Sequence, residues 1–240
     1  MLSPSLKSLC WCMTLLSALS ISSVMADGSS VGQIYAPYVQ PLEKEIELVA
    51  VYDARAKDVQ IPSSHWGKIG YGTSLWDNVY TEFSVTNIVD DHNRYYIAEL
   101  EGIWQLTEQG EYNSDWGMLF ELEMGIDRDA NEFTVGVLNS KDFGNYTLLT
   151  NGLIAVEWGD DIGDEVETSL AMQLRYRWSS ALEPTMEFFL SQDTFSIGPG
   201  LTGVVKLDGP KQLRWNFAAL AGLENTSQYS VKLELEYEFF

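Results

Sequence analysis

The sequence predicts an all-β protein, an antiparallel up-and-down barrel of about twelve strands (range ten to fourteen) that crosses a membrane. Three observations lead to this prediction. Runs of alternating apolar and polar residues recur along the chain, and turn residues (Asp, Asn, Gly, Pro and Ser) separate them. After residue 26, no segment is long and apolar enough for a transmembrane helix. A closed barrel is the other structure that satisfies every backbone group in lipid.

The composition favours one large domain and excludes a nucleic-acid partner. The chain has 240 residues, 45% of them hydrophobic, which is enough for a single all-β domain. It carries 14 Lys and Arg against 35 Asp and Glu, a net charge of −21 at pH 7. A nucleic-acid partner would need a basic surface, which this composition does not supply.

Residues 1–26 have the features of a secretory signal peptide. Lys7 is the only charged residue among them, an apolar run follows at residues 9–21, and Ala26 supplies a small residue at the expected cleavage site. Both cysteines, Cys10 and Cys12, lie in this segment. We therefore expect a mature chain without disulfides, thiolate metal ligands or a lipid-modified cysteine.

Residues 27–44 are predicted to be extended and to form no ladder with the barrel. Pro37 and Pro41 stand four residues apart in the stretch Ile34-Tyr-Ala-Pro-Tyr-Val-Gln-Pro41, and proline cannot donate a backbone hydrogen bond. We favour a periplasmic lead-in to the first strand. The alternative is a small plug that folds into the barrel mouth. The barrel itself is predicted over residues 45–240.

The first half of the barrel contains six predicted strands. The fifth shows the clearest alternation, because Trp116, Met118 and Phe120 oppose Glu121 and Glu123 on a pleated strand. The sixth is short. These strands are predicted over residues 45–52, 65–73, 79–86, 95–106, 116–126 and 133–138.

The second half contains six more. In the last of them, Leu233 and Leu235 share one face, and Lys232 and Glu234 share the other. The tenth contains Gly198-Pro-Gly200, and a proline inside a strand predicts a bulge or a break. These strands are predicted over residues 146–158, 168–178, 186–190, 195–207, 213–223 and 229–240.

Trp and Tyr residues lie at the ends of the apolar faces and not in their middle. A lipid-facing surface places Trp and Tyr at the two membrane interfaces, whereas a soluble core would gather them in its centre. A weaker alternative, a secreted soluble barrel that binds a small ligand, requires the Trp and Tyr face to point inward. The predicted membrane girdle consists of Trp104, Trp116, Tyr146, Trp158, Tyr176, Trp178, Trp215, Tyr229, Tyr237 and Phe239.

The signal, the hairpin rhythm and the terminal Tyr237-Glu-Phe-Phe240 resemble a Gram-negative outer-membrane β-barrel protein of the small, porin-like kind. The stretch from Ile34 to Glu43 is also similar to the start of small proteobacterial outer-membrane proteins of unassigned function. The family's terminal strand usually has its apolar residues in phase with a final Phe, whereas here they are in phase with Phe239.

The resemblance implies a location and partners. It implies the outer membrane after removal of the signal, both termini in the periplasm, and the longer loops outside. Lipid and lipopolysaccharide would surround the barrel, and the barrel-assembly machinery would recognise its C-terminal strand.

The polar faces are predicted to line the lumen. Twelve strands enclose a space between a filled eight-stranded barrel and an aqueous porin. An open path with an acidic surplus favours a narrow passive channel for small solutes or cations. Alternatively, Arg–Glu pairs plug the lumen, and the barrel serves a structural or partner-binding role without conducting. The predicted lumen residues are Glu99, Glu101, Glu121, Glu123, Glu157, Arg175, Arg177, Arg214, Lys232, Glu234 and Glu236.

The sequence does not predict an enzyme. A Ser–His site needs a histidine base beside a nucleophile, and the two histidines, His65 and His92, lack that context. The acidic turns near Asp127 and Asp160 do not complete a calcium-loop pattern, and they are interpreted as solvated turn residues. We therefore expect no catalytic residue, metal or cofactor.

Overall fold

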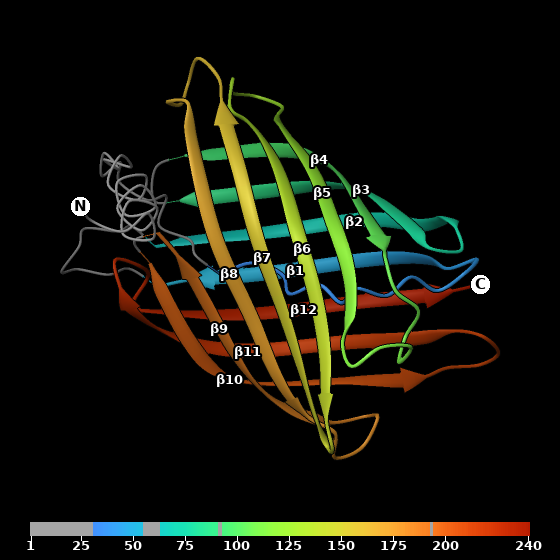
Figure 1. Cartoon of the computed structure of the whole chain (residues 1–240). Coiled ribbons are helices and arrows are strands. Elements are labelled where there is room, and N and C mark those ends of the chain that lie inside the picture. Colours follow the sequence, from blue (N-terminus) through green and yellow to red (C-terminus); the bar gives the residue numbers. More distant parts are fainter. Residues whose placement is uncertain (1–30, 55–62, 91–92, 193) are drawn as a thin grey trace, which may run out of the picture.

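Twelve strands close into one barrel in the computed structural model, which describes residues 31–54, 63–90, 93–192 and 194–240 (Figure 1). Among these residues, no helix is long and apolar enough to cross a membrane. The strands are β1 (Lys44–Asp53), β2 (Ser64–Trp76), β3 (Val79–Asp90), β4 (Arg94–Gln105), β5 (Asp115–Gly125), β6 (Asn131–Phe143), β7 (Tyr146–Trp158), β8 (Glu165–Tyr176), β9 (Glu183–Ser191), β10 (Phe195–Lys206), β11 (Gln212–Glu224) and β12 (Tyr229–Phe239).

Each strand pairs antiparallel with the next, and β12 returns to pair with β1. Ten residue pairs join these two strands, from Lys44 opposite Phe239 to Asp53 opposite Ser230. Closure leaves no sheet edge with unpaired backbone groups, as a strand-built membrane span requires. The predicted all-β up-and-down barrel is confirmed. We call the end at Lys44 and Phe239 the C-terminal mouth, and the end at Asp53 the far mouth.

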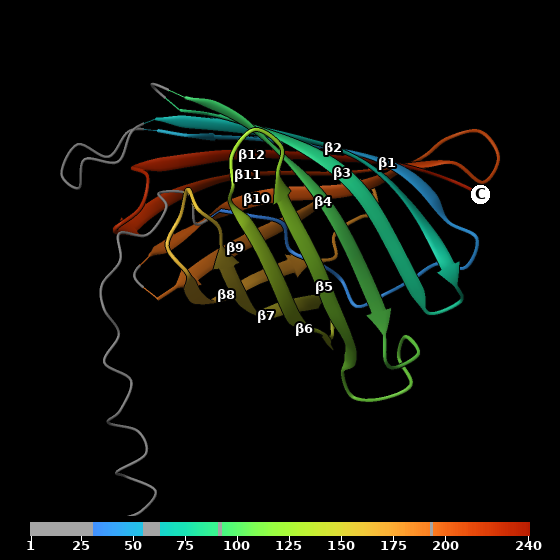
Figure 2. The same ribbon diagram turned by 90° about the horizontal axis from the view of Figure 1, so that it is seen from above.

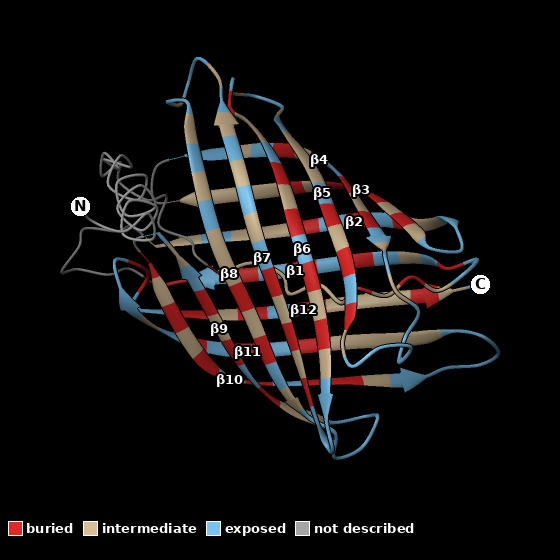
Figure 3. Ribbon diagram, viewed as in Figure 1, coloured by how far each residue is buried: buried red, intermediate tan, exposed pale blue. Residues whose placement is uncertain are grey.

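Burial alternates along the strands (Figure 3), and most of the exposed strand positions hold apolar side chains. In β1, Glu47 is 4% exposed, whereas the neighbouring Leu48 is 45% exposed. Tyr52 is likewise 45% exposed, and Asp53 is fully buried. A soluble barrel has the reverse arrangement, with apolar side chains inside and charged ones in water. The outward aromatic face therefore argues against the soluble-barrel alternative.

The outward Trp and Tyr residues gather toward the two mouths, and they do so unevenly. Of the ten predicted girdle residues, Trp158 and Tyr229 lie at the far mouth and the other eight lie at the C-terminal mouth. Trp178 stands just beyond β8 and is 70% exposed, while Tyr146 and Tyr176 pack with ring centroids 5.1 Å apart. Aromatic belts of this kind are typical of lipid-facing barrels at the membrane interfaces.

Two strands differ from their predicted form. β6 is 13 residues long instead of short, and it pairs along its whole length with β7 through a turn that contains Gly144 at φ 60°. Its second half, residues 139–143, is mostly polar, so it lacks the apolar pattern that marks a strand. β10 continues as one strand through Pro199 with an unbroken register to β9, and its register shift against β11 lies between Phe195 and Ser196.

Glycine explains why β10 continues past its proline. A Cβ added at Gly198 would lie 1.9 Å from the carbonyl oxygen of Ala219, so the two backbones approach more closely there than any larger residue allows. Pro199 stands opposite Met186 of β9 in the same unbroken register.

Candidate functional site

Residues 31–43, which precede β1, run lengthwise through the inside of the barrel (Figure 2). Val31 belongs to a buried apolar cluster with Leu220 in the far half of the lumen, and Val39 belongs to a second one with Ile103 near the C-terminal mouth. We call residues 31–43 the lumen segment. The favoured expectation of a lead-in outside the barrel does not describe these residues.

Three wall side chains hold the lumen segment by its backbone. The Tyr35 amide donates to Asn151 Oδ1 at 2.7 Å, and Asn151 Nδ2 donates to the Tyr35 carbonyl oxygen at 2.9 Å. The Val39 amide donates to Gln105 Oε1 at 2.7 Å. Lys232 Nζ donates to the Gly32 carbonyl oxygen at 3.1 Å. These bonds satisfy backbone groups that the segment cannot pair in a ladder.

The side chains of the lumen segment also fit the wall. Pro37 is fully buried, and a Cβ added at Gly117 of β5 would lie 3.0 Å from the Pro37 Cβ. The tyrosine hydroxyls on either side of this proline point to wall carboxylates. Tyr38 donates to Asp115 Oδ2 at 2.8 Å, and Tyr35 approaches Glu121 Oε2 at 3.5 Å. The absence of a side chain at Gly117 therefore makes room for the proline.

A buried lysine on β2 holds four carboxylates from three other strands. Lys68 Nζ lies 3.1 Å from Glu47, 3.3 Å from Glu82, 3.1 Å from Glu99 and 3.9 Å from Glu101. The Lys68 side chain is 3% exposed. This group, which we call the Lys68 cluster, ties β1, β3 and β4 to β2 and contains more carboxylates than cations.

A second buried lysine, on β12, joins the barrel wall to the lumen segment. Lys232 of β12 is fully buried and lies 3.0 Å from Glu187 of β9 and 3.1 Å from Glu234. Asn216 of β11 donates to both carboxylates, at 3.0 and 2.8 Å. Since Lys232 also binds the Gly32 carbonyl oxygen, the wall and the segment share one hydrogen-bonded network.

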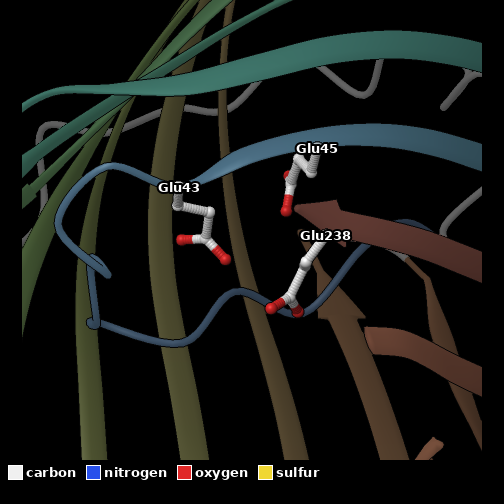
Figure 4. Close-up of side chains that lie close together, drawn as sticks. All are labelled: Glu43, Glu45 and Glu238. Atoms are coloured by element: carbon white, nitrogen blue, oxygen red, sulfur yellow. The ribbon is translucent and has the colours of Figure 1, made fainter. Parts of the chain in front are cut away.

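Three glutamates meet at the C-terminal mouth, where the lumen segment turns into β1 (Figure 4). Oxygens of Glu43, Glu45 and Glu238 lie within 4.8 Å of one another. Burial and the nearby Glu238 raise the pKa of Glu43 to about 7. Carboxylates at such spacing could hold Ca²⁺. However, Glu45 accepts from the Tyr80 hydroxyl, and Glu238 accepts from Arg214 at 2.8 Å. Glu99, Glu101 and Glu121 form a second group of three glutamates whose carboxylate oxygens lie within 4.8 Å of one another.

Ten of the eleven predicted lumen residues occupy inward positions of their strands. Arg175 pairs with Glu183 of the adjacent β9 at 3.1 Å, and Arg214 pairs with Glu236 of the adjacent β12 at 2.8 Å. Arg177 differs, because it stands just beyond β8 at the rim, where it pairs with Asp142 at 2.7 Å. The arginine pairs therefore run along the wall, and the element that crosses the lumen is the lumen segment. The other inward residues are Glu99, Glu101, Glu121, Glu123, Glu157, Lys232 and Glu234.

Sequence analysis did not identify Glu82, Gln105, Gly117 and Asn151 as lumen residues. Glu82 could have been found, because it alternates with the outward Phe83 on β3. The two amides and the glycine carry no charge or motif that distinguishes them from ordinary strand residues. Of the two histidines, His65 is exposed on β2, and His92 lies outside the described residues.

No protein-family model matches the sequence, and no curated protein matches it significantly. Solved structures do match the fold. The COG4313 outer membrane channel from Pseudomonas putida F1 matches over 91% of this chain and 99% of its own, with a TM-score of 0.61 and 12% identity. The fold is that of outer-membrane β-barrel proteins. The KdgM porin in complex with disordered oligogalacturonate matches over 82% and 98%, with a TM-score of 0.55 and 9% identity. The beta domain of the Bordetella autotransporter BrkA matches over 82% and 100%, with a TM-score of 0.53 and 9% identity.

Proposed function

We propose that the protein is a non-enzymatic outer-membrane barrel of a Gram-negative bacterium that forms a narrow, cation-preferring passive channel for small solutes. The lumen segment acts as its plug. The observation that carries this proposal is the combination of an acidic wall with a segment that pairs with no strand. In this arrangement the C-terminal mouth faces the periplasm, and the signal peptide is removed. Lipid and lipopolysaccharide contact the aromatic outer surface, and the assembly machinery recognises β12.

The wall charges support a preference for cations. The Lys68 cluster sets four carboxylates against one ammonium group, and Glu121 and Glu123 of β5 add two more on the same side of the lumen. Rings of carboxylates attract cations and repel anions in narrow pores. Among the described residues, the buried or half-buried wall cations Lys68, Arg175, Arg214 and Lys232 are each paired with a glutamate, which offsets their charge.

A second candidate function is a structural or partner-binding barrel that does not conduct. The observation in its favour is that the lumen segment contacts the wall from its far half to the C-terminal mouth, through Gly32, Tyr35 and Val39. In that case the segment is a permanent part of the core. The channel proposal differs in requiring that the segment leave or shift.

Conductance of the refolded protein in planar bilayers distinguishes the two functions. We expect cation-preferring steps, read from the reversal potential in a salt gradient. Replacing Glu121 and Glu123 with glutamine should lower the cation-to-anion permeability ratio by roughly twofold, because two lumen charges are removed. The matched control replaces Glu108 and Glu111, two exposed glutamates of the loop before β5, and should leave the ratio unchanged.

A full-length variant in which residues 33–40 are replaced by alternating glycine and serine (the Gly/Ser variant) is measured alongside. A protein that migrates as a folded, heat-modifiable barrel, yet stays electrically silent in both forms, would support the non-conducting role and contradict the channel.

A further inference from the structure

The contacts that hold the lumen segment resemble those of a peptide in a binding site. Asn151, which is fully buried, makes two hydrogen bonds to the backbone of one residue, Tyr35. Gln105 binds the backbone of Val39, four residues further along. Backbone contacts of this kind recognise an extended chain, while pockets for individual side chains provide specificity.

The wall supplies such pockets around a single proline. Pro37 fills the space that the missing side chain of Gly117 leaves, and the hydroxyls of Tyr35 and Tyr38 point to the carboxylates of Glu121 and Asp115. A peptide with different residues at these positions would lose these contacts or collide with the wall. These contacts fit a proline flanked by tyrosines.

The barrel closes without the lumen segment. The ladder pairs of all twelve strand neighbours fall within residues 44–239, and β1 and β12 alone share ten of them. Departure of residues 33–40 therefore breaks side-chain contacts but no sheet hydrogen bond. The segment is positioned as a ligand on a preformed wall.

We propose that the lumen is a peptide-binding site for an extended peptide with a tyrosine-flanked proline, and that residues 33–40 occupy it as a tethered, exchangeable ligand. This inference goes beyond the channel function and holds whether or not the barrel conducts. The tether keeps the local concentration of the segment on the order of millimolar, so the resident segment excludes a free peptide until its own contacts are weakened.

Binding of a synthetic peptide with the sequence of residues 31–42, labelled with fluorescein at its amino end, tests the proposal. The titration uses the Gly/Ser variant refolded in detergent, and binding is measured by fluorescence anisotropy of the labelled peptide. We expect saturable binding. Adding Asn151→Leu to the variant should weaken binding about tenfold or more, since it removes two hydrogen bonds of roughly 1 kcal/mol each. Thr150→Val, on the outward face of the same strand, should leave binding unchanged.

Three results would overturn the proposal: no saturable binding, equal binding of a peptide with the same residues in scrambled order, or unchanged binding with Asn151→Leu. If the Gly/Ser variant does not fold, the full chain with Tyr35→Ala and Tyr38→Ala replaces it in the same titration. Bilayer recordings separate this proposal from the channel. A silent barrel that binds the peptide supports the peptide site and contradicts the channel, whereas an open channel that neither binds the peptide nor is blocked by it overturns the peptide site alone.

Discussion

The Gly/Ser variant is expected to be open on the order of 100 times more often than the wild-type protein. The variant keeps the backbone groups that Asn151 and Gln105 bind. It loses the Tyr38–Asp115 hydrogen bond, worth roughly 1 kcal/mol, and the buried side chain of Val39, worth roughly 2 kcal/mol to the closed state. A population ratio changes tenfold for every 1.4 kcal/mol. Loss of the Pro37 contact adds to the effect. The measurement is the open fraction of single channels in planar bilayers.

Its control is a second full-length variant, in which the exposed residues 108–112 of the loop between β4 and β5 are replaced by glycine and serine. This loop lies at the same mouth and has a similar length, so a general loosening of the C-terminal mouth would open both variants. Equal open fractions in the wild type and the Gly/Ser variant would contradict the plug.

Replacing Lys68 with methionine is expected to destabilise the barrel by about 3–5 kcal/mol, because it leaves four buried carboxylates without their shared cation. Methionine keeps most of the side-chain volume, so the loss is electrostatic. Urea-induced unfolding in lipid vesicles, followed by tryptophan fluorescence, measures the change.

Two comparisons show whether charge is the cause. Lys44→Met, at an exposed position at the start of β1, should change the stability little. Adding Glu99→Gln and Glu101→Gln to Lys68→Met should restore part of the lost free energy, since two of the unpaired charges are removed. A triple variant no more stable than Lys68→Met would mean that packing, and not charge, accounts for the loss.

The strands, and which of their residues point inward or outward, were predictable from the alternation of apolar and polar residues. Side chains alternate strictly across a strand, so the apolar residues of β5 and β12 located the polar ones and, with them, ten of the eleven predicted lumen residues. Arg177 has the inward parity but stands beyond β8, and only the position of the strand end decides this. Strand ends depend on pairing with neighbours, as the polar second half of β6 illustrates.

The path of residues 31–43 was not predictable in the same way. Pro37 and Pro41 exclude ladder pairing, but that holds equally for a chain outside the barrel and a chain inside it. The decision rests on contacts between residues far apart in sequence, such as Tyr35 with Asn151 and Val39 with Gln105. The same limit applies to Gly117, whose role becomes visible only when Pro37 lies against it.

Disulfide cross-linking between the lumen segment and the wall tests the central claim most directly. In the chain from Asp27 onward there is no native cysteine, so Pro37→Cys and Gly117→Cys introduce one defined pair. The Pro37 Cβ and a Cβ at position 117 would lie 3.0 Å apart, and a shift of a few tenths of an ångström brings them to the range of about 3.5–4.5 Å found in disulfides. The control pairs Pro37→Cys with Met118→Cys, on the outward face of β5.

We predict that a mild oxidant cross-links the first pair and not the control, that the cross-linked barrel stays closed in bilayers, and that reduction restores its openings. Mass spectrometry identifies the linked peptides. A first pair that cross-links no more than the control would contradict a lumen occupied by residues 31–43.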